Sequence, residues 1–177
     1  MTLNTLLTSF DTWEPHQPSN SSDDLITEII KRGALPKNIH LIRKLPVDSQ
    51  LAPEQVIAKI NQLQPNIIIC CGMAESREKL TIESNAKDES QVIKTTVDTD
   101  RLLSGLSITE ISHDAGWFVC NKLYYSILNY IYQMNLKSQC LFVHVPILTK
   151  DNLEQITSDF LVILHKLNCF KFNLHSG

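Results

Sequence analysis

The stretch Asn66-Ile67-Ile68-Ile69-Cys70-Cys71-Gly72 decides the fold, together with a similar one at Cys140-Leu141-Phe142-Val143-His144-Val145. Each is an almost continuous apolar run, far shorter than the roughly 20 residues that cross a bilayer. Such a run is typical of a strand covered on both faces. Helical patterns alternate with strand-like runs along the rest of the chain. The sequence therefore predicts an α/β fold: a single three-layer α/β/α domain over residues 1–177, with a mostly parallel mixed central sheet.

The remaining elements follow from apolar spacing and from capping residues. Further strands are expected at 5–10, 39–45, 80–82, 91–97 and 107–112. Helices are expected after a cap at Ser22 or Asp23, around Pro53, from 118 to about 134, and after a cap at Asp151. In open α/β sheets ligands collect where strands end and helices begin. The loops after Phe10, after Gly72, around Cys120 and after His144 are therefore the candidate ligand-binding loops.

Composition narrows the class of protein. The 177 residues include 16 Lys and Arg against 19 Asp and Glu, a formal charge of −3, with no basic block. This balance argues against nucleic acid or an anionic membrane as the main partner. Five cysteines are an odd number in a chain of this length, so a disulfide framework is not expected. Residues 1–10 lack the basic start of a secretory signal, and we expect a cytoplasmic protein.

Of the five thiols, Cys120 is the one whose position in the sequence best suits a reactive nucleophile. It follows Gly116 and lies near the start of the helix expected from residue 118. A helix N-terminus lowers a thiol pKa and offers N–H groups to an oxyanion. The alternative is that Cys120 is a small buried apolar residue, the commoner role of a free cysteine. The other four thiols are expected to be packing residues: Cys70, Cys71, Cys140 and Cys169.

His144 and Glu83 could complete a catalytic set with this thiol. His144 ends an otherwise apolar strand, and Glu83 follows the short strand at 80–82. A nucleophilic cysteine needs a His as its base, and that His needs an acceptor that orients its ring. Each residue also has an ordinary interpretation, as a core His with satisfied hydrogen bonds and as an exposed Glu. No metal, P-loop or dinucleotide motif is recognised, so we expect no metal and no cofactor.

Four segments resemble one known family. Ser112-His113-Asp114-Ala115-Gly116-Trp117-Phe118-Val119-Cys120-Asn121 resembles the active-site cysteine signature of the pyrrolidone-carboxylate peptidases, also called pyroglutamyl peptidases type I. Residues 8–13 resemble the family's TGFEPF loop, residues 71–83 its GQAGGR-to-TVE segment, and residues 142–146 its FIHVP strand. Four motifs in the same order are far more specific than any one of them alone.

The resemblance implies a cytosolic cysteine peptidase with an α/β/α fold of the phosphorylase/hydrolase-like type. Such an enzyme removes an N-terminal pyroglutamyl residue from peptides through a thioester acyl-enzyme. The resemblance makes Cys120 the nucleophile, His144 the general base and Glu83 the orienting acid. It also implies a set of substrate-binding residues, of which the first two would enclose the flat lactam: Phe10, Trp13, Met73 and Val119. The expected partners are N-terminally pyroglutamylated peptides, and the oligomeric state is left open.

Several positions depart from the family pattern. The segment between 83 and 112 is short, and two loop glycines are replaced by Glu75 and Ser76. The family's oxyanion Arg would fall near Ile93, where the nearest cation is Lys94. Two alternatives therefore stand beside the peptidase: a weakly active or inactive homologue that binds a peptide or a partner, and a cysteine hydrolase for another acyl group.

Overall fold

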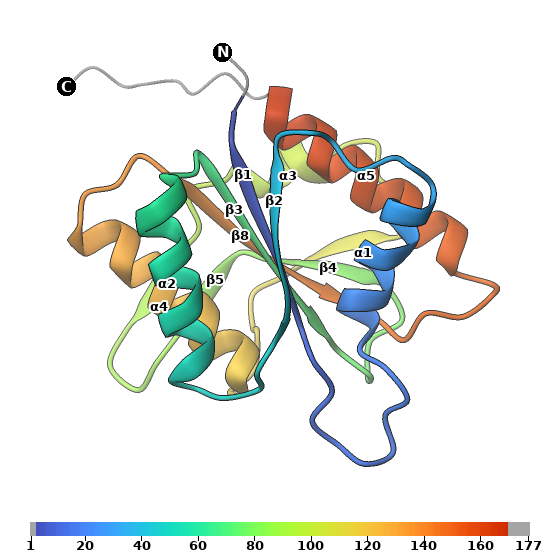
Figure 1. The fold of residues 1–177 in the computed structure, drawn as a ribbon, viewed down its shortest axis with the longest axis horizontal. Coiled ribbons are helices and arrows are strands. Elements are labelled where there is room, and N and C mark those ends of the chain that lie inside the picture. Colours follow the sequence, from blue (N-terminus) through green and yellow to red (C-terminus); the bar gives the residue numbers. More distant parts are fainter. Residues whose placement is uncertain (1–2, 170–177) are drawn as a thin grey trace.

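The structure, a computed structural model, describes residues 3–169 and contains a six-stranded sheet (Figure 1). Neighbouring strands in the sheet are, in order, β2 (Ile39–Leu45), β1 (Thr5–Phe10), β3 (Ile67–Met73), β8 (Gln139–Val145), β4 (Leu80–Glu83) and β7 (Thr109–Ser112). All neighbours are parallel except β4 and β8, which pair antiparallel. The predicted mixed, mostly parallel sheet is confirmed.

Helices cover both faces of this sheet, as Figure 1 shows. One face carries α1 (Ser21–Lys31), α3 (Thr99–Leu103) and α5 (Leu153–Cys169), and the other carries α2 (Leu51–Leu63) and α4 (Val119–Gln133). Each side of the sheet has its own apolar cluster, and every residue of β3 is buried between the two. The unbroken apolar run 67–71 reflects this position, because both of its faces pack against helices.

Two helix starts differ from the prediction. The side chain of Asn20 accepts a hydrogen bond from the Ser22 amide, so α1 begins at Ser21, before the caps expected at Ser22 or Asp23. Asn and Ser are both good caps, and the sequence alone does not rank neighbouring candidates. Helix α5 begins at Leu153, which places Asn152 rather than Asp151 directly before it. Gly33, with φ of 64°, ends α1 as expected.

The segment between Glu83 and β7 was predicted least well. The strand expected at 91–97 is a three-residue strand, β6 (Val92–Lys94), that forms a hairpin with an unpredicted strand, β5 (Asn85–Lys87). The short helix α3 was also missed. The hairpin is held to α4 by the Asn121 side chain, which accepts a hydrogen bond from the amide of Lys87 and donates one to its carbonyl. Tertiary contacts of this kind stabilise the hairpin, and its own sequence shows little of the apolar alternation that predicts a strand.

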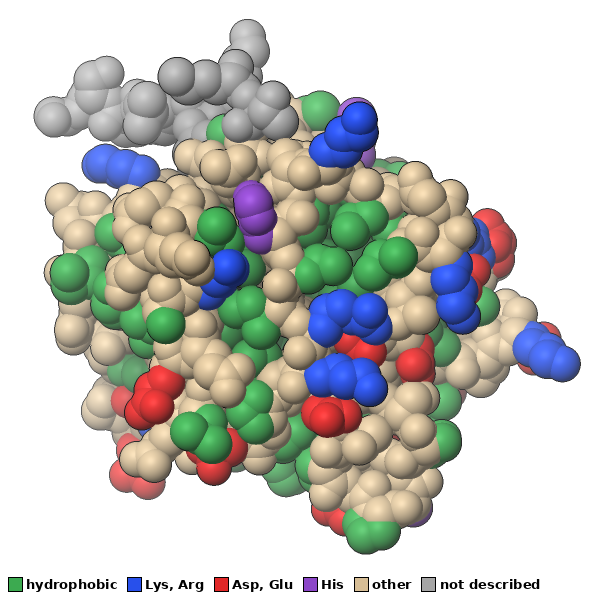
Figure 2. Space-filling view, viewed as in Figure 1, with side chains coloured by type: hydrophobic (Ala, Val, Ile, Leu, Met, Phe, Trp, Pro, Cys, Tyr) green, Lys and Arg blue, Asp and Glu red, His purple; other side chains and the backbone are tan. Residues whose placement is uncertain are grey.

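Surface properties agree with the balanced composition. Figure 2 shows Lys and Arg side chains interspersed with Asp and Glu on the face that it presents. Within residues 3–169, no helix has the length and apolar character needed to cross a membrane. Cys70, Cys71 and Cys140 are buried as expected, whereas Cys169 is exposed at the end of α5, so its assignment as a packing residue is wrong.

Candidate active site

The carboxyl ends of β1, β3 and β8 meet the start of α4 around a cavity of about 800 Å³. Six of the residues expected to act in catalysis or substrate binding line it: Phe10, Trp13, Met73, Val119, Cys120 and His144. The expected loops after β1, after β3 and around Cys120 all contribute. From β8, the cavity receives His144 itself rather than the loop that follows, which differs from the prediction. A volume of this size is typical of a small-molecule or peptide-end site.

Cys120 is the second residue of α4, and its sulfur packs closely over β3. A Cβ atom at position 72 would lie 2.6 Å from Cys120 Sγ and 2.9 Å from Cζ of Phe142. Gly72 is paired in register with His144 on the neighbouring strand. The absence of a side chain at Gly72 therefore lets the thiol approach the strand beside the imidazole.

The ionisation state of this thiol differs from the prediction. Burial raises the pKa of Cys120 to about 12, and the charges of Cys70 and Glu83 act in the same direction. The backbone N–H of Cys120 and the charge of Arg77 lower the pKa, but by less. The helix N-terminus thus lowers the thiol pKa as expected, but burial raises it by more. The thiol is protonated at neutral pH, so a base must remove its proton when it attacks.

Glu83 and His144 form a buried pair on the neighbouring strands β4 and β8. Oε1 of Glu83 lies 2.7 Å from Nδ1 of His144, and the two residues are 0% and 5% exposed. Burial opposes ionisation of Glu83, but the hydrogen bond and charge of His144, with the charge of Arg77, keep its pKa below the usual value. An ionised carboxylate can only accept, so Nδ1 carries the proton and Nε2 is left for another partner.

Arg77 lines the cavity and is a charged residue to which sequence reasoning gave no role. Its Nη1 donates to Glu83 Oε1 at 2.7 Å, and its Nη2 donates to the carbonyl of Asp114 at 3.1 Å. Lys94, the nearest cation to the position of the missing family Arg, lies on β6 and is exposed. The signal that could have found Arg77 is the arginine of the GQAGGR motif, which falls at this position when residues 71–83 are matched to the family segment.

Aromatic and acidic residues shape the mouth of the cavity. Phe10 is buried, Trp13 is 43% exposed, and Phe118, which was not predicted, is 82% exposed. Glu75 replaces a loop glycine of the family pattern and bonds the side chains of Gln17 and His16 from the β1–α1 loop. These contacts join two loops of the mouth, where the family pattern has only backbone.

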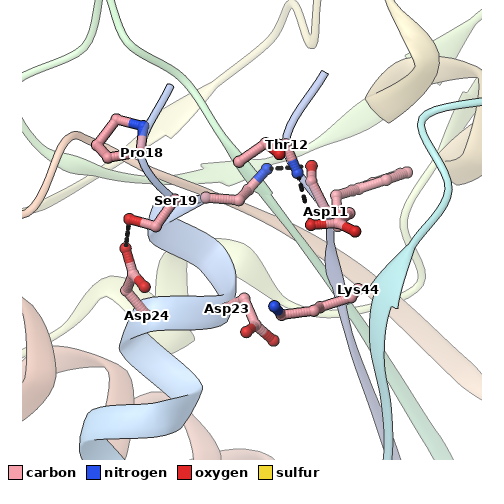
Figure 3. A pocket seen from close by; sticks show the side chains of 9 residues that line it. Asp11, Thr12, Pro18, Ser19, Asp23, Asp24 and Lys44 are labelled. Atoms are coloured by element: carbon pink, nitrogen blue, oxygen red, sulfur yellow. Dashed lines mark hydrogen bonds between the residues drawn. The ribbon is translucent and has the colours of Figure 1, made fainter. Parts of the chain in front are cut away.

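A smaller polar pocket of about 200 Å³ lies beside this cavity and shares Phe10 and Asn20 with it. Figure 3 shows Lys44 extending toward Asp23, and Ser19 bonded to Asp24. Asp23 is also paired with Arg43 at 2.7 Å. The carboxylates therefore already have partners: that of Asp23 lies on β2, and that of Asp24 lies in the loop before α1.

Comparison with known proteins decides the family. The pyrrolidone-carboxylate peptidase of Brachyspira hyodysenteriae is 32% identical over 157 residues, which covers 71% of this chain and 78% of that protein. The chain belongs to the pyrrolidone-carboxylate peptidase family. The family's sequence model, described as pyroglutamyl peptidase, matches residues 102–164, a span that contains Cys120 and His144. The family member of Vibrio vulnificus is 27% identical over 169 residues, covering 81% of this chain and 78% of that protein.

Solved structures of pyrrolidone-carboxylate peptidases share the fold. Pyroglutamyl peptidase I from Bacillus amyloliquefaciens superposes with a TM-score of 0.82 at 22% identity, covering 96% of this chain and 97% of that one. The pyrrolidone carboxyl peptidase from Thermococcus litoralis gives a TM-score of 0.78 at 18% identity, covering 94% and 93%. The fold expected from the family resemblance is therefore confirmed.

Proposed function

We propose that this member of the family is a cysteine peptidase that removes an N-terminal pyroglutamyl residue from peptides. Cys120 acts as the nucleophile, His144 as the general base and Glu83 as the acceptor that orients the imidazole. The observation that carries the proposal is the buried Glu83–His144 pair, 2.7 Å apart, beside a cavity that also receives the Cys120 thiol.

The chemistry follows from these positions. His144 Nε2 removes the thiol proton as Sγ attacks the carbonyl carbon of the bond between the pyroglutamyl residue and the next residue. N–H groups at the start of α4 are available to the oxyanion that forms. The imidazolium then returns its proton to the leaving amine, which leaves a thioester on Cys120. A water molecule, deprotonated by His144, hydrolyses this thioester and releases pyroglutamate.

The substrate end of the cavity suits a flat, mostly apolar ring. Phe10 and Trp13 come from β1 and the loop after it, while Met73 and Val119 come from the end of β3 and the start of α4. We assign these four residues to lactam binding. The lactam has no charge, which fits a pocket whose walls are more apolar than polar.

Hydrolysis of a pyroglutamyl–fluorophore amide tests the proposal. The parent protein should release the fluorophore, Cys120→Ala should release none, and Cys169→Ser should keep the parent rate because that exposed thiol is outside the cavity. Release that persists in Cys120→Ala, or no release at high enzyme concentration, would contradict the proposal. Amides of acetyl or proline residues, run alongside, identify a hydrolase for another acyl group.

One observation favours a second candidate, a peptide-binding homologue without turnover. The protonated thiol, whose pKa is raised to about 12 by burial, is a poor nucleophile unless His144 reaches it. A binding module would retain a pyroglutamyl peptide in both the parent protein and Cys120→Ala, and neither would cleave it. Turnover by the parent protein excludes this candidate.

We also propose that the enzyme works in the cytoplasm. All five cysteines are free thiols, which suits a reducing compartment.

A further inference from the structure

The carboxylate of Glu83 is held in an unusual way. Both of its charged partners, Arg77 Nη1 and His144 Nδ1, bind the same oxygen, Oε1, each at 2.7 Å. The other oxygen, Oε2, is buried without a hydrogen-bond partner among residues 3–169. Burial opposes ionisation of this carboxylate, and His144, the Ser112 hydroxyl and Arg77 act against burial to lower its pKa. Its two charged donors are His144 and Arg77.

The two donors are not equivalent. An imidazole that acts as a base is uncharged, so His144 cannot supply a positive charge to Glu83 in that state. The guanidinium of Arg77 remains charged at every pH that the protein experiences. The other groups facing Glu83 are neutral at pH 7: Ser112 pairs with it in register on β7, and Cys120 and Tyr124 face it from α4. Tyr124 donates to the backbone carbonyl of Glu83 rather than to its carboxylate.

Arg77 also reaches the segment that leads into the nucleophile helix. Nη2 donates to the carbonyl of Asp114, six residues before Cys120, while Nη1 binds Glu83. Two loops far apart in sequence, β3–β4 and β7–α4, are thus joined by one guanidinium that is 23% exposed. A planar fork with two separate donors is suited to this bridging, and a lysine ammonium is not.

We propose that Arg77 is a positioning residue for the reaction, one that keeps Glu83 ionised while His144 is neutral and thereby fixes the imidazole with its proton on Nδ1. The inference rests on the proposed roles of Cys120, His144 and Glu83. The fixed tautomer leaves the Nε2 lone pair for the Cys120 proton. Without the guanidinium, the Glu83–His144 pair keeps its extra proton up to a higher pH. The imidazole is then available as a base over a narrower pH range.

The test compares Arg77→Met with Arg77→Lys. The matched control is Arg32→Met, because the Arg32 guanidinium likewise binds two groups, the carboxylates of Glu28 and Glu154, and lies at the far end of α1. Thermal unfolding identifies variants that remain folded. Two readouts follow: the pH profile of kcat/KM for a pyroglutamyl amide, and a 15N NMR titration of His144, assigned with His144→Gln, which needs no substrate.

Removal of a cation beside the pair favours the protonated form of the imidazole, so the NMR titration curve should move to higher pH by about one unit in Arg77→Met. The acid limb of kcat/KM should move up by the same amount, lowering activity about tenfold on that side through kcat rather than KM. Arg77→Lys should return both values toward the parent, while kcat stays reduced because the bridge to Asp114 is lost. Arg32→Met should match the parent in both readouts.

Two results would overturn the proposal. One is an unchanged His144 titration in folded Arg77→Met; the other is an equal loss of activity in Arg77→Met and Arg77→Lys with no shift of the acid limb, which indicates a purely structural role. A parent protein that cleaves no pyroglutamyl amide would refute the proposed function instead, and the NMR titration would still decide whether Arg77 controls His144.

Discussion

Gly72→Ala is the substitution whose effect the structure defines most closely. A Cβ atom there would lie 2.6 Å from Cys120 Sγ and 2.9 Å from Phe142 Cζ. Both distances are well inside normal carbon–sulfur and carbon–carbon contacts, so the sulfur or the ring must move by most of an ångström. Overpacking of this kind costs roughly 1–3 kcal/mol of stability. A displacement of about 1 Å at a reacting atom costs about 10²-fold in rate.

The assay combines unfolding in urea with hydrolysis of a pyroglutamyl amide. Gly72→Ala should lose both stability and activity, and part of its stability loss should vanish in Gly72→Ala/Cys120→Ala, where the sulfur is absent. We expect a coupling of about 1 kcal/mol in this double-mutant cycle. Gly105→Ala is the control, because nothing lies within 4 Å of the added Cβ: it strains a positive φ of 79° without coupling to Cys120 or lowering activity. Full activity and zero coupling in the Gly72 cycle would refute the packing argument.

Three further predictions test other parts of the account. Burial raises the pKa of Cys120 to about 12. The rate at which iodoacetamide alkylates this thiol, measured in a Cys169→Ser background, should therefore rise about tenfold per pH unit between pH 6 and 9. A rate that reaches a plateau by pH 7 would show a thiolate instead. Glu83→Gln should lower kcat less than Cys120→Ala, since it misorients the base and leaves the nucleophile; equal and complete loss would make Glu83 structural. Asp159 accepts hydrogen bonds from Ser107, Ile108 and Thr109, and although burial opposes its ionisation, these bonds lower its pKa. A lowered folded-state pKa stabilises the protein above the unfolded value, near 4, and the benefit is lost as pH falls further. Asp159→Asn should therefore cost about 2 kcal/mol at pH 7 and much less at pH 3, whereas an equal cost at both values would rule out a charge effect.

Much of the fold could be predicted because the sequences of the central strands indicate that these strands are buried on both faces. The runs at 67–71 and 140–145 are apolar on both faces, and that pattern has few structural explanations. Strand β6 lies within the strand expected at 91–97, but β5 and its pairing with β6 could not be predicted. The hairpin is held by the Asn121 side chain and by α4 rather than by its own periodicity. Helix starts were displaced by one to three residues where several capping residues follow one another.

Sequence motifs predicted that the proposed site residues lie together, but they did not predict the electrostatics of the site. Motif order placed Cys120, His144 and Glu83 in one hypothesis, and the structure brings the three together with the expected pocket residues. The thiol pKa was predicted with the wrong sign because the sequence reveals a helix start but not how deeply the sulfur is buried. The role of Arg77 was missed because its partners, Glu83 on β4 and Asp114 in the β7–α4 loop, are brought to one guanidinium only in the folded chain.

Mass spectrometry of the acyl-enzyme tests the central claim most directly. The parent protein is mixed with a pyroglutamyl amide, quenched in acid within one turnover and digested. The account predicts one pyroglutamyl group on the peptide that contains Cys120, lost on longer incubation and absent from Cys120→Ala. Turnover without any adduct at Cys120, or an adduct on another of the five thiols, would contradict the assignment of Cys120 as the nucleophile.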